Sequence, residues 1–272
     1  MSKMPTLFMP HGGGPCFFID WDPPDTWDEM ANYLRGIPGD VGQTPEAIVV
    51  ISGHWEENTV TVQSNPAPGL LFDYYGFPDA TYQLEYPAPG SPKVTERIVG
   101  LLAESGIECR RDSQRGFDHG VFIPLKVAFP EAKIPIVQLS LRADLDPASH
   151  IAIGRAIEPL REEGILIVGS GLSYHNMNTM MRHMHGGSTA VRLPESELFD
   201  DWLSTTVADP DPEARNRALI VWEQAPAARD AHPREDHFLP LHVVAGAAGA
   251  DIGKKMYGGA VLGAAMSAYQ FG

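Results

Sequence analysis

Short apolar runs alternate with segments of helical periodicity along most of this 272-residue chain. The runs are rich in β-branched residues, which is typical of strands buried in a sheet. They occupy Thr6–Met9, Ala47–Ser52, Thr59–Gln63, Ile134–Leu139 and Ile165–Gly169. The helical patterns cover Pro92–Ser105, Ser149–Arg161, Ser196–Val207 and His237–Ala248. This alternation predicts an α/β fold: a single domain with a central mostly parallel or mixed sheet flanked by helices.

Two further segments have neither pattern. Asn65–Ser91 is rich in Pro, Gly and aromatic residues and is too apolar for a linker, so it predicts a packed surface loop or a wall over a pocket. Pro210–Arg234 is acidic and then Ala-rich, which favours an exposed helix. Because no segment marks a domain boundary, we expect residues 1–272 to form one domain.

The charge and the cysteine content exclude several classes of protein. The formal net charge is −15, and the absence of a dense basic run argues against a nucleic-acid partner. No stretch approaches the roughly 20 apolar residues of a membrane span, and the first residues lack the apolar core of a signal peptide. Cys16 and Cys109 are too few for a disulfide framework, so we expect a reducing compartment, the cytoplasm.

Three of the ten histidines follow predicted strands. His11 comes just after the strand Thr6–Met9, His54 follows Ala47–Ser52, and His175 follows Ile165–Gly169. Ligands of α/β sheets bind outside the carboxyl ends of the strands, so these side chains are expected to converge on one site. Glycines beside them would let backbone approach a ligand closely.

Two more histidines lie in segments suited to a site. His119 is in the Gly-flanked loop GFDHG, and His237 is at the predicted start of a helix, next to Glu235 and Asp236. Neutral imidazole suits Fe, Zn, Cu and Ni, and three protein ligands with open positions are typical of a catalytic metal site. The sequence therefore predicts a metal centre, with carboxylate ligands from Glu235 or Asp236 as an alternative to His237.

The other histidines and glycine motifs favour ordinary structural roles. His183 and His185 in MRHMHGG indicate an exposed polar loop, His150 and His242 indicate capping or packing, and His232 before Pro233 indicates a loop. HGGGP resembles the oxyanion-hole glycines of lipases, but no G-x-S-x-G elbow follows a strand. GSGLS lacks the spacing of a nucleotide-binding loop.

An ordered set of motifs along nearly the whole chain resembles the class III extradiol ring-cleavage dioxygenases of the 4,5-DOPA dioxygenase type. The motifs are LFMPHGGGP, AIVVISGHW, YGFPDATYQLEYPAPGSP, RGFDHGVFIPLKVAFPEAKIPIVQLSL, ILIVGSGLSYHN and HPREDHFLPLHVVAGAA. The resemblance implies one α/β catalytic domain that opens a catechol ring next to the diol, using O2 and a non-haem metal.

The resemblance also implies roles for individual residues. The metal ligands match His11, His54 and His237, the catalytic histidine matches His175, and His119 matches a histidine that binds substrate or moves protons. His175 would titrate near neutral pH as general base and then general acid. Tyr174 is a candidate for contacting the substrate; Arg115 and Arg182 could meet a carboxylate or polar tail.

Two departures from the family pattern concern the substrate. The family has HGSP where this chain has HGGGP, and HDFGGFP where this chain has Phe72–Pro78 without the histidine. Both segments are expected to line the substrate entrance, which puts L-DOPA itself in question as the substrate.

The expected cofactor is Fe(II), with Zn(II) as a competing occupant of a three-histidine site. The expected partners are a small catecholic substrate and O2, in a monomer or homodimer. Two other functions stay open: a zinc-dependent hydrolase, in which His175 or Glu235 would activate water, and a non-enzymatic metal-binding protein of the same fold.

Overall fold

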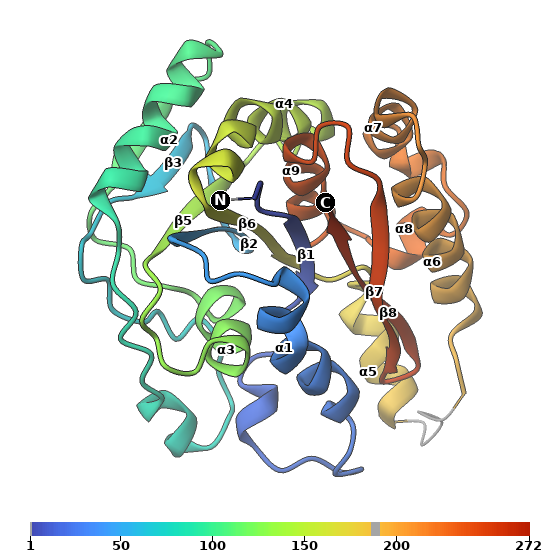
Figure 1. The fold of residues 1–272 in the computed structure, drawn as a ribbon. Helices are drawn as coiled ribbons and strands as arrows, with labels where there is room; N and C mark the ends of the chain where they lie inside the picture. Colours follow the sequence, from blue (N-terminus) through green and yellow to red (C-terminus); the bar gives the residue numbers. More distant parts are fainter. Residues whose placement is uncertain (1, 186–190) are drawn as a thin grey trace.

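A computed structural model describes residues 2–185 and 191–272. One eight-stranded sheet runs through the molecule (Figure 1). Its strands are β1 (Thr6–Pro10), β2 (Ala47–Glu57), β3 (Val60–Gln63), β4 (Cys109–Asp112), β5 (Ile136–Arg142), β6 (Ile165–Gly171), β7 (Gly253–Val261) and β8 (Ala264–Phe271).

The sheet is parallel at its centre and mixed toward its edges. The strand order is β4-β3-β5-β2-β6-β1-β8-β7. The neighbours β5, β2, β6 and β1 run parallel, whereas β8 pairs antiparallel with both β1 and β7. The carboxyl ends of β1, β2 and β6 therefore meet at one edge, and the predicted fold class is confirmed.

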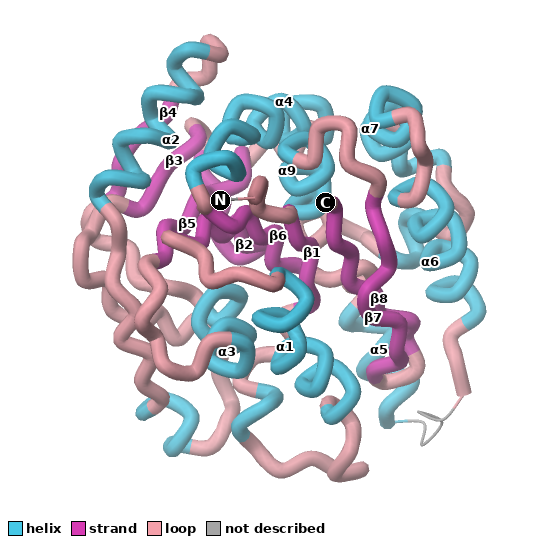
Figure 2. The backbone as a smooth tube through the Cα atoms, viewed as in Figure 1, coloured by secondary structure: helices cyan, strands magenta, loops and turns pink. Residues whose placement is uncertain are grey.

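Helices cover both faces of this sheet (Figures 1 and 2). The α-helices are α1 (Asp28–Val41), α2 (Pro92–Glu104), α3 (His119–Ala128), α4 (Pro147–Ile157), α5 (Met177–His185), α6 (Pro194–Val207), α7 (Pro212–Ile220), α8 (Ala228–Ala231) and α9 (Leu239–Ala247). Short 3-10 turns are η1 (Cys16–Phe18), η2 (Asp79–Gln83), η3 (Glu158–Glu163) and η4 (Trp222–Gln224).

Alternation along the central strands builds a core on each face. In β2, Ile48 and Val50 pack with residues of α1 and α3, whereas Val49 and Ile51 pack with residues of α2, α4 and α9. Successive strand side chains point to opposite faces, so a run that is apolar throughout needs cover on both sides. A third cluster joins β7 and β8 to α6 and α8.

Most predicted elements are confirmed with shifted ends. The strand predicted at Ala47–Ser52 continues to Glu57, and the one predicted at Ile134–Leu139 begins at Ile136. The helix expected from His237 begins at Leu239 instead, so His237 lies in the preceding turn. Phe271 and Tyr269 of β8 are buried core residues, but the sequence pattern predicts neither strand of the β7–β8 hairpin.

The predictions for the irregular segments had mixed outcomes. Asn65–Ser91 is a packed loop, in which Tyr74 and Tyr86 are buried against the core that includes α3. Pro210–Arg234 does contain helices, yet Trp222 and His232 are buried in the core rather than exposed. The prediction of a loop at His183 and His185 was wrong, because both residues lie in the last turn of helix α5. Residues 186 and 187 of that motif lie outside the described residues.

Among the described residues, no helix is both long enough and apolar enough to cross a membrane.

Candidate functional site

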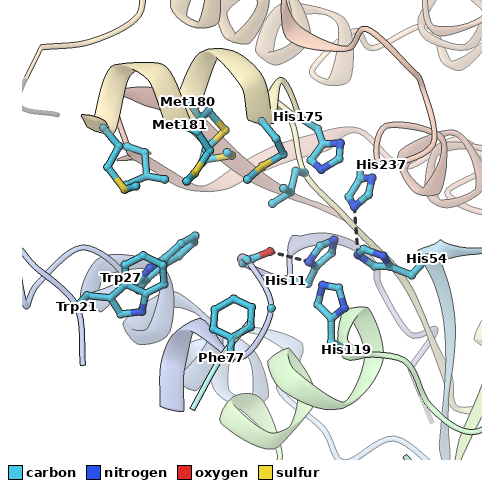
Figure 3. A pocket seen from close by; sticks show the side chains of 18 residues that line it. His11, Trp21, Trp27, His54, Phe77, His119, His175, Met180, Met181 and His237 are labelled. Carbon is cyan, nitrogen blue, oxygen red and sulfur yellow. Dashed lines mark hydrogen bonds between the residues drawn. The ribbon is translucent and has the colours of Figure 1, made fainter. Parts of the chain in front are cut away.

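Five histidines meet at the carboxyl edge of the parallel strands (Figure 3). His11 directly follows β1, and His175 lies in the loop after β6. His54 lies inside β2, where the register against β5 shifts between Ile51 and Glu56. Such irregularities re-aim side chains at functional sites. His119 is the first residue of α3, and His237 lies just before α9. The expected convergence of the histidines on one site is therefore observed.

The imidazole rings are in close contact. The ring centroids of His54 lie 4.9 Å from those of His11, 4.6 Å from those of His237 and 3.9 Å from those of His119. The Nε2 atoms of His54 and His237 are 3.1 Å apart. The ring of His175 stacks on that of His237 at 3.5 Å.

Oxygen atoms lie beside the outer nitrogens of the rings. His11 donates from Nδ1 to the Gly12 carbonyl at 2.8 Å, which leaves Nε2 as the lone-pair nitrogen. Nδ1 of His54 lies 3.6 Å from the Asp73 carboxylate, and Nδ1 of His237 lies 3.1 Å from that of Asp236. Partners of this kind fix the tautomer and orientation of histidines that bind metals through the other nitrogen.

Asp73 connects two of the histidines and was not identified from the sequence. Its Oδ1 accepts hydrogen bonds from the backbone N–H of His119 at 3.0 Å and from Nδ1 of His119 at 2.7 Å. It therefore caps the N-terminus of α3, where a negative charge is favourable. Backbone hydrogen bonds from Leu71 and Phe117 to the facing chain bring Asp73 there.

Asp118 fixes the part of β2 that carries His54. Its buried carboxylate accepts hydrogen bonds from Ser52 at 2.8 Å and from Arg115 at 3.0 Å, as well as from the side chain of Gln138. Ser52 in turn accepts from the backbone N–H of His54, and Arg115 donates to the His54 carbonyl at 3.0 Å. Both sides of the His54 backbone are thus tied to one buried carboxylate.

Gly171, the last residue of β6, allows the His237 segment to lie against the sheet. A Cβ atom at Gly171 would stand 2.1 Å from the His237 carbonyl oxygen. The next residue, Leu172, donates a backbone hydrogen bond of 3.0 Å to that same oxygen. Only glycine permits so close an approach of two backbones.

Burial keeps four of these imidazoles neutral, those of His11, His54, His175 and His237. Burial, together with neighbouring histidines, lowers the pKa of His54 and of His175 to about 4. Burial and the surrounding imidazoles hold the pKa of His11 and His237 well below the ordinary histidine value. The expectation that His175 titrates near neutral pH is therefore wrong for the protein without substrate, because desolvation disfavours the imidazolium.

The cluster fits a metal ion. Two sets of donor atoms each lie within 4.8 Å of one another: His11, His54 and His119, and His175, Asp236 and His237. The buried Nε2 of His11 has no hydrogen-bond partner, so its lone pair is available to a metal. Two imidazole nitrogens bound to one metal at about 2.1 Å would stand about 3.0–3.4 Å apart, which matches the His54–His237 spacing.

A cavity of about 370 Å³ opens beside the histidines. All five histidines line it, together with Gly12, Gly13, Gly14, Trp21, Trp27, Phe77, Leu172, Met177, Met180, Met181, Met184, Leu262 and Met266. Phe77 comes from the segment Asn65–Ser91, so the prediction of a wall over a pocket is confirmed. The volume falls in the range of small-molecule sites, about 300–1,000 Å³.

Tyr174, predicted to contact the substrate, does not line this cavity. Its side chain is 1 % exposed and packs in the core with Met180 and Leu193. Arg115 supports β2 as described, and Arg182 is exposed on α5 and bonds to its own helix. Glu235 pairs with Arg229, away from the cavity lining. The carboxylate of Asp236 faces Arg234 and Nδ1 of His237.

Comparison with protein families finds one that spans nearly the whole chain. The model of the catalytic LigB subunit of aromatic ring-opening dioxygenase matches residues 6–270.

Individual relatives carry related names. The chain is 38 % identical to a 4,5-DOPA dioxygenase extradiol of Beta vulgaris over 250 residues, covering 90 % of this chain and 87 % of the relative. It is 36 % identical to Dioxygenase tasH of Hapsidospora irregularis, covering 100 % and 86 %. A crystal structure of an uncharacterized protein from Escherichia coli K12 superposes with a TM-score of 0.77 at 28 % identity, covering 99 % of this chain and 100 % of that one.

Proposed function

The chain belongs to the LigB family of class III extradiol dioxygenases, which cleave aromatic rings, and we propose that its histidine cluster holds a non-haem Fe(II) for opening a catechol beside the diol. One observation carries this proposal. The unpartnered Nε2 of His11 and the Nε2 atoms of His54 and His237, which are 3.1 Å apart, lie at one end of a cavity large enough for an aromatic ring.

We assign the metal ligands to His11, His54 and His237. The Nε2–Nε2 spacing of His54 and His237, the unpartnered Nε2 of His11 and the oxygen atoms behind each Nδ1 support this set. His237 is favoured over Glu235 and Asp236 because its ring lines the cavity, whereas neither carboxylate does. When bound, iron(II) would bring the diol and O2 together and supply the redox chemistry, which Zn(II) at the same ligands would not.

His175 is proposed as the proton acceptor for the diol. Its ring lines the cavity and is neutral at pH 7, because burial lowers its pKa to about 4. A neutral imidazole has a lone pair with which to accept a hydroxyl proton. Negative charge left on the diol would then stabilise the imidazolium and raise the pKa of His175, so that it returns the proton during ring opening.

His119 is proposed to hydrogen-bond the substrate oxygen. Its Nδ1–H is committed to Asp73 at 2.7 Å, which leaves Nε2 as an acceptor toward the cavity. The same carboxylate also lies near His54, so one group orients a proposed ligand and a proposed substrate contact. Fixed orientation of this kind lowers the cost of reaching the reactive geometry.

The remaining proposals concern the whole protein. We propose one catalytic domain over residues 1–272 that takes a small catechol and O2 and works in the cytoplasm without nucleic-acid or membrane partners, as a monomer or homodimer. The family match across residues 6–270 supports the single domain. The net charge of −15 is unfavourable for binding nucleic acid.

Anaerobic loading of the protein with either Fe(II) or Zn(II), followed by an O2 electrode measurement with catechol, tests the function. We expect O2 uptake and a yellow ring-opened semialdehyde with iron, and neither with zinc. Hydrolytic activity with zinc and no O2 uptake with iron would favour the hydrolase instead. Binding of metal without any turnover would favour a binding protein.

A further inference from the structure

The wall of the cavity points to the kind of tail that the substrate carries. Figure 3 shows the histidines at one end of the cavity and Trp21, Trp27, Met180 and Met181 at the other. Since the diol belongs at the histidines, the ring substituent would extend toward the tryptophans and methionines. An apolar protein cavity of about 150 Å³ accommodates benzene, so about 370 Å³ leaves room for a substituent beyond the ring.

This far end is apolar. Apart from the histidines, no side chain that the structure describes around the cavity is ionisable. Residues 186–190, which the structure does not describe, have the sequence Gly-Gly-Ser-Thr-Ala and contain no charged side chain. Burying a carboxylate or an ammonium without a partner costs far more than burying a methylene gains.

The methionines of α5 give a second, independent indication. Met177 and Met181 are 40 % and 37 % exposed, although thioether side chains gain free energy when covered. Both line the cavity, so an apolar tail would remove them from water. A charged tail would leave that gain unrealised.

Charged groups in two neighbouring surface hollows do not offset this. Arg234 lies in a hollow that shares His175 and Met177 with the cavity, but it is already paired with Glu56 and Asp236. Asp25, Asp28, Glu29 and Arg192 line a separate surface hollow that shares only Leu262 with the cavity. The three carboxylates would repel an anionic tail. Nε1 of Trp27 is buried without a partner, but a single indole N–H does not offset the desolvation of a carboxylate.

Resting on the proposed function, we propose that the substrate is a catechol with an uncharged, apolar substituent rather than an amino-acid or carboxylate-bearing catechol. Met177, Met181 and the two tryptophans determine this preference. The cavity thus selects against L-DOPA through the cost of burying its ammonium and carboxylate.

A substrate series that varies only in charge tests this proposal. 4-Propylcatechol, dihydrocaffeate and L-DOPA share a three-carbon tail that is neutral, anionic or zwitterionic. We expect kcat/KM of the iron-loaded enzyme to be higher for 4-propylcatechol by about tenfold or more, mainly through KM. Substrate affinity can also be measured without O2, from the quenching of tryptophan fluorescence. The three catechols should bind in the same order of affinity.

Variants of Met181 sharpen the test. Met181→Lys places a cation at the exposed edge of the wall and should raise kcat/KM for dihydrocaffeate relative to 4-propylcatechol by about tenfold. Met181→Leu should keep the original order of substrates. Leu198→Lys adds the same charge on α6, outside the cavity lining, and should also leave the order unchanged.

The failures are distinguishable. If L-DOPA or dihydrocaffeate is turned over as well as 4-propylcatechol, the apolar preference is overturned while the proposed function stands. If none of the three supports O2 uptake by protein with confirmed iron, the proposed function fails and the substrate class fails with it.

Discussion

At the scale of single residues, each proposed ligand presents one ring nitrogen to the cluster and has an oxygen atom behind the other. The sequence could predict which histidines take part, because their positions after strands and their motifs are local features. It could not predict Asp73, whose contact with His119 spans 46 positions and depends on chain pairing at Leu70 and Phe117. It also suggested Tyr174 as a substrate contact. Tyr174 follows β6, as His175 does, but its side chain packs into the core.

The choice of third ligand can be tested with two alanine variants. His237→Ala should lose the metal, because it removes the nitrogen 3.1 Å from Nε2 of His54. His119→Ala should retain the metal, because we propose that the His119 ring, oriented by Asp73, contacts the substrate and does not bind the metal. Metal content after dialysis, measured by mass spectrometry, decides between them. Full loss in His119→Ala with retention in His237→Ala would reverse the assignment.

His175→Ala should keep its metal and turn over slowly. We expect kcat to fall by about 10²–10⁴-fold, the usual contribution of a positioned acid–base group. His185→Ala, at the exposed end of α5, serves as the matched histidine control and should behave as wild type. Normal turnover by His175→Ala would show that another group accepts the proton.

Asp73→Asn should weaken catalysis without unfolding the protein. The carboxylate side chain is 21 % exposed, and its loss removes the negative charge that orients His54 and His119. Partners behind metal ligands are worth about 10–100-fold in metal affinity or activity. Asp79→Asn in the same segment is the control and should change neither steady-state kinetics nor metal affinity. Wild-type values for Asp73→Asn would remove this residue from the site.

At the scale of elements, strands with runs of Val, Ile and Leu were predictable and the C-terminal hairpin was not. β7 and β8 are rich in Gly and Ala, so their residues carry little strand propensity. They are strands because β8 pairs with β1 at the edge of the parallel sheet, which is a long-range contact. The starts of α4, α6 and α9 each differ by two residues from the predicted starts for a related reason, since packing and capping override local periodicity.

The packing of α4 on α9 gives a prediction at this scale. A Cβ atom at Gly154 of α4 would stand 2.0 Å from the Val243 carbonyl oxygen of α9. We expect Gly154→Ala to lower the free energy of unfolding by about 1–3 kcal/mol, as overpacking does. Gly100→Ala in α2, where the added Cβ meets nothing within 4 Å, should be neutral or stabilising. Urea unfolding measures both, and equal stability of the two variants would contradict this packing.

At the scale of the whole molecule, buried structural histidines make stability depend on pH. Burial lowers the pKa of His242 to about 4, although the Leu219 and Phe238 carbonyl oxygens beside its two ring nitrogens favour the protonated ring and oppose the shift. The unfolded chain takes up this proton near the ordinary pKa of about 6.5, so the unfolded state is favoured as pH falls from 6.5 toward 4. The slope is at most about 1.4 kcal/mol per pH unit for one histidine.

The difference between wild type and His242→Leu isolates this contribution from the effect of the net charge. Urea unfolding between about pH 7 and pH 5 should show a shallower pH dependence for the variant, whatever its absolute stability. If the free energy of unfolding changed with pH equally in the two proteins, His242 would not stay neutral in the folded state.

We propose that this molecule inserts O2 into the ring bond beside a catechol's diol, at iron held by His11, His54 and His237. The most direct measurement supplies isotopically labelled O2 to iron(II)-loaded protein with 4-propylcatechol and analyses the product by mass spectrometry. We predict a ring-opened product with label in its new carboxylate and, before exchange with water, in its aldehyde. A product whose new oxygen comes only from water, or an intact ring despite bound iron, would contradict the account.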